Sequence, residues 1–198
     1  SISDYCMGMI GNWGVHHLDI AQWANASELS GPVEIEGTAE FPKGLLTDCA
    51  VSWQVENRYA NGVTLIHMDN ATSGKHPLQK GGHGHGVMLI GTEGWVHVDR
   101  QKLDAHPAAL IESKIGPDEI HLFKSDNHGA NFIGAVKGRN KPAAPIDVAV
   151  RTDTLCNLQL IAATLRRKLR WDPEAERFAD DPAANAMLDR PMRAPWTL

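Results

Sequence analysis

The sequence predicts one α+β domain in which a helix is followed by an antiparallel sheet and then by further helices. Apolar residues recur with a period of two between residues 33 and 99, and with the helical period before and after that stretch. Tight turns at Asn61-Gly62 and at residues 92–94 join successive expected strands, which implies an antiparallel sheet. The 198 residues, 42% hydrophobic and 22% charged, are sufficient for one ordinary core and argue against disorder.

The first helix is expected over residues 14–26. His16, Ile20 and Trp23 recur there at helical spacing. Asn12 precedes this run and is the predicted N-cap, because its side-chain carbonyl can accept a backbone N–H of the first turn.

Strands are expected over residues 33–40, 49–56, 63–70, 87–91 and 95–99. In the first two, apolar and polar residues alternate, which is typical of a sheet with one buried face. Asn61-Gly62 predicts a type I′ hairpin turn between the second and third strands, since that turn needs positive φ at both positions. A loop rich in glycine and histidine, residues 81–86, precedes the fourth strand.

The last third of the chain is expected to be helical. Ser125 or Asp126 can cap a helix over residues 127–137, and Asp147 opens a longer helix. The apolar stripe of that longer helix is Leu155, Leu158, Ala162, Leu165 and Leu169, and Trp171-Asp172-Pro173 ends it. The basic run of residues 166–170 then falls at its end and complements the helix dipole, and a short helix over 182–188 precedes the tail.

Charge and cysteine content exclude several classes of protein. The formal net charge of −5 argues against a nucleic-acid partner, and no stretch is apolar enough to cross a membrane. Cys6, Cys49 and Cys156 are far apart in the sequence, so we expect reduced thiols rather than a disulfide framework. The N-terminus resembles no signal peptide and lacks an initiator Met, so we expect a fragment or processed product of a cytoplasmic protein, with the periplasm as the alternative.

The densest cluster of chemically active side chains lies between residues 12 and 19. On one helix, Asn12, His16 and Asp19 would be four and three positions apart, hence roughly on one face. An imidazole beside a carboxylate suits general acid–base catalysis, because its pKa lies near neutrality and the carboxylate stabilises its charged form. The alternative is a capped helix start with a hydrogen-bonded histidine.

The segment of residues 8–23, GMIGNWGVHHLDIAQW, resembles the D-x-G-x-H-x-x-D segment of the Gfo/Idh/MocA oxidoreductases, most closely the branch reading D-W-G-x-H-H-x-D-I-A-Q-W. Further similar pieces follow in order at residues 30–36, 90–95, 127–132, 171–173 and 185–196. The resemblance therefore covers nearly the whole chain.

The resemblance implies that residues 1–198 form the C-terminal domain of such an enzyme. This GAPDH-like domain is an open, mainly antiparallel sheet with helices packed on one face, and it supplies the substrate site and the oligomer contacts. NAD or NADP would bind mainly to an N-terminal Rossmann domain, and this chain has neither the G-x-G-x-x-G motif nor the E-K-P lysine of that domain. The intact protein would oxidise or reduce a sugar, cyclitol or related polyol as a homodimer or homotetramer assembled through the sheet, and the fragment alone would be inactive.

The resemblance also assigns roles to residues. His16 would be the catalytic acid–base, and Asn12 stands where the family has its partnering acid. An amide can hydrogen-bond a hydroxyl but cannot act as a base, so this departure puts the usual activity in doubt. Asp19 would orient groups or bind substrate, and His128 would either line the substrate pocket or lie on the first turn of its helix.

Three alternatives remain. The intact protein could be an NAD-dependent glycosidase of the same superfamily. The chain could instead be a non-catalytic dimerisation or ligand-binding domain, which Asn12 and the missing Rossmann half favour. His83 and His85, with His76 nearby, invite a zinc or nickel site, but two histidines do not close a coordination sphere, so we predict no metal.

Overall fold

The computed structural model describes residues 1–190 and 192–197, and its strands form two antiparallel sheets. The first sheet has five strands in the order β3-β2-β1-β7-β8, and the second has three in the order β4-β5-β6. The strands are β1 Glu34–Glu40, β2 Ser52–Arg58, β3 Thr64–Met68, β4 Val87–Ile90, β5 Trp95–Val98, β6 Leu103–His106, β7 Leu169–Asp172 and β8 Arg177–Phe178.

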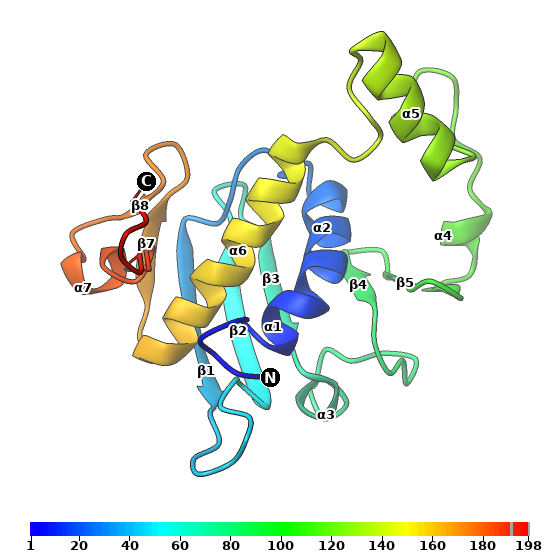
Figure 1. Ribbon diagram of the computed structural model, residues 1–198. Coiled ribbons are helices and arrows are strands. Elements are labelled where there is room, and N and C mark those ends of the chain that lie inside the picture. The colour runs from blue at the N-terminus through cyan, green and yellow to red at the C-terminus, as the bar shows by residue number, and fades with distance from the viewer. Residues whose placement is uncertain (191, 198) are drawn as a thin grey trace.

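Seven helices accompany these strands in the described part of the chain. They are α1 Met9–Asn12, α2 Gly14–Ala24, α3 Asn70–Ser73, α4 Ala109–Glu112, α5 His128–Gly138, α6 Ile146–Leu165 and α7 Pro182–Asn185. Figure 1 shows α6 and α2 side by side on one face of the five-stranded sheet. The predicted α+β class, with antiparallel strands and helices on one face, is confirmed.

The main core lies between α6 and the inner face of the five-stranded sheet. Ile35 on β1 and Val55 on β2 are completely buried, and they belong to one apolar cluster with Leu158 and Ala162 of α6. Burying each large aliphatic side chain stabilises the fold by roughly 1.5–3 kcal/mol, so this layer dominates the stability of the domain. The outer face of β1 and β2 carries charged side chains, including the opposed pair Glu36 and Glu56.

The long helix ends earlier than the sequence pattern predicts. Arg166 adopts a left-handed conformation with φ of 52°, which ends α6, and the chain returns as β7 beside β1. Leu169 therefore belongs to a strand, where it and Trp171 are buried on the same face. Only a few residues of β7 show the period of two, so the sequence pattern at Leu169 fits a helix as well as a strand.

The basic run after α6 has different partners from those predicted. Instead of complementing a helix dipole, Arg167 pairs with Asp181 through a bidentate contact. Arg170 lies on β7 and contacts Asp180 at 3.1 Å. The basic residues thus join β7 to the acidic turn before α7.

Two local predictions are corrected in detail. The hairpin between β2 and β3 exists, but of Asn61 and Gly62 only Gly62 adopts a positive φ, 88°. Since the Gly62 amide donates to the Tyr59 carbonyl at 3.0 Å, the connection is a longer loop closed by a left-handed glycine. The cap of α5 is Asn127, whose side chain accepts from the Ala130 amide at 2.8 Å, rather than Ser125 or Asp126.

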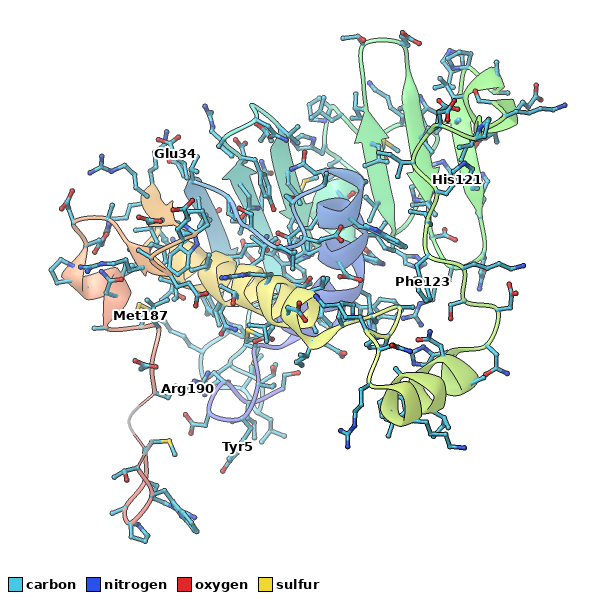
Figure 2. All side chains as sticks on the ribbon, turned by 90° about the horizontal axis from the view of Figure 1, so that it is seen from above. Tyr5, Glu34, His121, Phe123, Met187 and Arg190 are labelled. Atoms are coloured by element: carbon cyan, nitrogen blue, oxygen red, sulfur yellow. The ribbon has the colours of Figure 1, made fainter. Side chains whose placement is uncertain are left out.

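Residues 107–145 lie apart from the core. None of them is buried, and α5 projects away from the sheet in both views (Figures 1 and 2). The apolar side chains of α5, Phe132, Ile133 and Val136, are each more than half exposed. None of the helices in the described part of the chain combines the length and apolar character needed to cross a membrane.

Candidate active site at the break between α1 and α2

The helix expected over residues 14–26 is present as α2, and a break at Trp13 separates it from α1. Asn12 is the last residue of α1, and Gly14 is the first residue of α2. The amides of His16 and His17 both donate to the Trp13 carbonyl, at 3.1 and 3.2 Å. The backbone hydrogen bonds of α2 therefore begin at Trp13. The predicted N-cap role of Asn12 is therefore wrong, because Trp13 occupies that position and no side chain caps α2.

Asn12 and His16 lie on either side of this break and are both exposed. The side-chain amide of Asn12 has one weak contact, 4.0 Å from the sulfur of Met9. Both polar side chains are thus accessible to a ligand approaching the break.

The indole of Trp13 is the centre of a cluster of rings. The centroids of the His16 and His17 rings each lie 5.5 Å from it, and the His85 ring lies at 5.9 Å. The Arg100 guanidinium stacks on the same indole, with its central carbon 5.0 Å from the ring centre. Edge-on aromatic contacts and a cation over an indole are both attractive, so Trp13 restricts the orientations of these side chains.

His17 differs from His16 in its environment. It is half-buried, and burial, followed by the charges of nearby His85 and His67, lowers the pKa of His17 to about 4. His17 is therefore neutral at pH 7 and can accept or donate a hydrogen bond without carrying charge.

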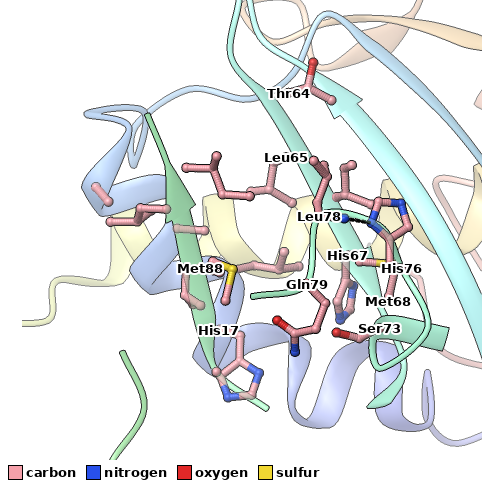
Figure 3. A pocket seen from close by; sticks show the side chains of 18 of the residues that line it. His17, Thr64, Leu65, His67, Met68, Ser73, His76, Leu78, Gln79 and Met88 are labelled. Carbon is pink, nitrogen blue, oxygen red and sulfur yellow. Dashed lines mark hydrogen bonds between the residues drawn. The ribbon is translucent and has the colours of Figure 1, made fainter. Parts of the chain in front are cut away.

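A cavity of about 620 Å³ extends from His17 into the gap between the two sheets (Figure 3). Its walls include all of β3 and β4, which are the end strands of their respective sheets. Figure 3 shows Met88 of β4 facing the β3 side of the cavity, where His67 and Met68 lie. The volume falls in the range of about 300–1,000 Å³ that is typical of small-molecule sites.

His67 is a half-buried polar residue of the cavity wall. Its Nδ1 atom lies 2.6 Å from the Oε1 atom of Gln159, a residue of α6 with no exposed surface. The amide oxygen accepts, so the ring nitrogen carries the proton. Burial lowers the pKa of His67, and the neutral ring is the form that this wall accommodates.

The remaining two predicted site residues do not join this cluster. Asp19 accepts a hydrogen bond from the hydroxyl of Thr152 at 3.2 Å, which ties α2 to α6. This partner is not His16, so an orienting or substrate-binding role for Asp19 stays a prediction. His128 is the exposed first residue of α5, and that helix lies apart from α2 in both views (Figures 1 and 2).

Sequence reasoning missed the ring cluster around Trp13. It assigned no role to Arg100 or His17, although the doubled histidine at 16–17 was a visible signal. The loop containing His85 was recognised as unusual, but nothing in the sequence indicated that it reaches Trp13. Among the described residues, no three His, Cys, Asp or Glu side chains are grouped in a way that could hold a metal ion.

The described residues do not fit a dinucleotide. All strand pairs in this part of the chain are antiparallel, whereas the usual dinucleotide fold needs parallel strands connected by a helix. The residues that line the cavity include no lysine or arginine to face a pyrophosphate. Any nicotinamide cofactor would have to be held by another part of the protein.

Two solved structures share this fold. An NAD-binding protein from Listeria innocua matches 82% of this chain with 16% identity and a TM-score of 0.51, over 47% of its own length. An oxidoreductase from Agrobacterium radiobacter, in complex with NAD⁺, L-tartaric acid and magnesium, matches 81% with 14% identity and a TM-score of 0.50, over 48% of its own length. The chain thus spans about half the length of these structures.

No curated protein is significantly similar to this chain. The model of the Gfo/Idh/MocA oxidoreductase family, C-terminal alpha/beta domain, matches residues 2–198. Since this match covers almost every residue and agrees with the antiparallel sheets, the chain belongs to that family and forms its C-terminal domain.

Proposed function

We propose that this chain is the substrate-binding half of an NAD(P)-dependent oxidoreductase that acts on a sugar, a cyclitol or a related polyol. The observation that carries the proposal is His16, an exposed imidazole held against Trp13 at the break between α1 and α2. NAD or NADP would bind to a separate Rossmann domain, which agrees with the poor fit of a dinucleotide to these residues.

This chain would supply the proton transfer of the proposed oxidoreductase reaction. In the direction of oxidation, the His16 imidazole would accept the proton of a substrate hydroxyl, and in reduction it would return that proton to the carbonyl oxygen. Nicotinamide chemistry supplies the hydride exchange. Asn12 would hydrogen-bond a neighbouring hydroxyl through its amide, and Trp13 would offer an apolar surface to the C–H groups of the substrate.

The test uses the full-length protein and a panel of sugars, cyclitols and hydroxy acids with NAD and NADP. Hydroxy acids belong in the panel because the Agrobacterium radiobacter structure contains L-tartaric acid. On the best substrate, His16→Ala should lower turnover by roughly 10²–10⁴-fold. His121→Ala, at an exposed histidine that contacts the Gly116 carbonyl, is the matched control and should leave turnover unchanged. Equal turnover of the His16 variant and the wild type would refute the assignment.

A second variant tests the departure from the family pattern. Asn12→Asp restores a carboxylate at the position of the family acid and should raise turnover if His16 is the acid–base, because a nearby negative charge stabilises the imidazolium. The pH dependence of turnover should shift toward higher pH in the same variant. If Asn12→Asp changed neither the turnover nor its pH dependence, a charge at position 12 would have no influence on His16.

A non-catalytic ligand-binding domain is the second candidate function. It is favoured by the cavity between β3 and β4, whose histidine His17 is neutral, and by the amide at Asn12. Calorimetric binding of a polyol without any NAD(P)-linked turnover would support this role over the first.

Assembly through the sheet is also a proposal. On the face of the five-stranded sheet opposite α6, β3 carries Ile66 and Met68, which are opposed across the strand pair to Glu56 and Gln54 and which also line the cavity. A second copy would cover this mixed face in a homodimer or homotetramer. A monomer in sedimentation at micromolar concentration would argue against it.

A further inference from the structure

Two cysteines that are 43 positions apart in the sequence lie together at the N-terminal end of the fold. The sulfur of Cys6, in the segment before α1, is 3.9 Å from the sulfur of Cys49, in the loop between β1 and β2. Both thiols are free, and the Cys49 thiol donates to the Cys6 carbonyl at 3.5 Å. The two thiols are therefore neighbours in the fold, although they are far apart in the sequence.

Several hydrogen bonds hold these two segments in register. The Ser3 amide and hydroxyl both donate to the Asp48 carboxylate, at 2.6 and 2.7 Å. The Thr47 hydroxyl donates to the Ser1 carbonyl at 2.7 Å. The two thiols are consequently neighbours because of the local fold.

The two thiols differ in exposure and in pKa, and both differences favour disulfide formation. Cys6 is exposed, and its pKa is lowered chiefly by the backbone amide of Gly8. Cys49 is buried, and burial raises its pKa. An accessible thiolate can react with an oxidant, and a protected thiol beside it can then resolve the product.

We propose that Cys6 and Cys49 form a reversible intramolecular disulfide when hydrogen peroxide oxidises the protein. The Cys6 thiolate attacks a peroxide oxygen, which forms an S–O bond, breaks the O–O bond and, after protonation, releases one water. The Cys49 sulfur then attacks the Cys6 sulfenic acid, which forms the S–S bond, breaks the S–O bond and releases a second water that carries the Cys49 proton. The two thiols are oxidised, the peroxide is reduced by the same two electrons, and side-chain rotation brings the sulfurs to the bonding distance of about 2.05 Å.

The disulfide would act next to the candidate site. Gly8 immediately precedes α1, and a Cβ atom added there would lie 2.6 Å from the Cβ atom of Cys49. The backbone before α1 is therefore already in close contact with Cys49, and α1 ends at Asn12. A covalent link would fix this end of the helix to the sheet.

The link should also stabilise the whole domain. Closing a loop between residues 43 positions apart restricts the unfolded chain, and this should raise the Tm by roughly 5–15 °C.

The experiment titrates the full-length protein with hydrogen peroxide and follows intact mass, peptide maps and thermal unfolding. We expect a mass loss of about 2 Da, a peptide pair linked through Cys6 and Cys49, a higher Tm, and reversal of all three by dithiothreitol. Cys6→Ser and Cys49→Ser should each abolish the linked pair. Cys156→Ser is the matched control and should retain it, because Cys156 has no exposed surface and burial raises its pKa to about 12.

The proposal would be overturned by stepwise oxygen addition at Cys6 without the linked peptide, or by a disulfide-bonded dimer through Cys6. An unchanged Tm in the linked protein would overturn the stabilising role. None of these readouts depends on oxidoreductase activity, so the result stands apart from the proposed function.

Discussion

The helices α6 and α5 have similar sequence signals but different surroundings. Helix α6 packs on the five-stranded sheet beside α2 and buries eight residues: Thr152, Leu155, Cys156, Leu158, Gln159, Ile161, Ala162 and Ala163. Helix α5 buries none, and its Phe132 is 58% exposed. Because an 11-residue helix is marginal in water, α5 relies on its Asn127 cap and on contacts such as the hydrogen bond from the Ala143 amide to Asn131. Periodicity therefore predicts a helix but not whether its apolar face is covered.

The largest difference should appear in hydrogen exchange. Amides of α6 near Leu158 should open only with global unfolding, whereas amides of α5 near Phe132 should open locally. Exchange measured by mass spectrometry on the 198-residue chain should be slower in α6 by roughly 10³-fold or more. Equal protection of the two helices would show that α5 is covered in solution.

Truncation of one phenylalanine in each region gives the next largest effect. Phe178 on β8 has no exposed surface, and its ring packs 5.0 Å from that of Trp171. Phe178→Ala should reduce the free energy of unfolding by about 3–5 kcal/mol, because it removes apolar contacts and leaves a cavity. The matched variant Phe132→Ala should change it by less than about 1 kcal/mol in urea unfolding. A cost at Phe132 equal to that at Phe178 would contradict the comparison.

Two glycine substitutions should act in opposite directions. At Gly37 on β1, an added Cβ atom would lie 2.6 Å from the carbonyl oxygen of Gln54, so Gly37→Ala should destabilise the protein by roughly 1–3 kcal/mol. At Gly134 in α5, an added Cβ atom meets no described atom within 4 Å, so Gly134→Ala should stabilise it by up to about 1 kcal/mol. Thermal unfolding of both variants measures these changes, and a destabilised Gly134 variant would reveal a neighbour that covers α5.

The last effect concerns pH and the cavity wall. The pKa of His17 falls from its ordinary value of 6.5 to about 4 on folding, so the unfolded chain binds the extra proton between those values. The contribution of neutral His17 is therefore complete above pH 6.5 and is lost as the pH falls toward 4, by roughly 1–2 kcal/mol after allowing for partial solvent screening. Urea unfolding at several pH values should show a shallower loss in His17→Gln, and an unchanged slope would show that the ring is solvated.

The residues predicted best are those with strong local patterns. The period of two predicted β1 and β2, and the helical stripe predicted α6 as far as Leu165. The prediction was wrong at Leu169, because the left-handed turn at Arg166 depends on the pairing of β7 with β1 and on no local signal. The strand β6 was not predicted, because Leu103–His106 contains no β-branched or aromatic residue that would indicate a strand.

The candidate site likewise contains some residues that the sequence predicted and others that it did not. The sequence singled out His16 and Asn12, and the structure places them on adjacent turns at an exposed break. It could not show that His85 and Arg100 contact Trp13, because both come from segments more than 70 positions later. For His128 the sequence left open whether it lines the substrate pocket or lies on the first turn of its helix, because its distance from α2 depends on how α5 packs.

The sequence by itself determined the α+β class, the order of most elements and the motif that contains His16, because these follow from short-range periodicity and residue chemistry. Only the tertiary structure decided that α1 and α2 are separate, that β3 and β4 enclose a cavity, and that Cys6 meets Cys49. Contacts of this kind join segments far apart in the chain, and their geometry depends on the packing of the whole domain rather than on any local pattern.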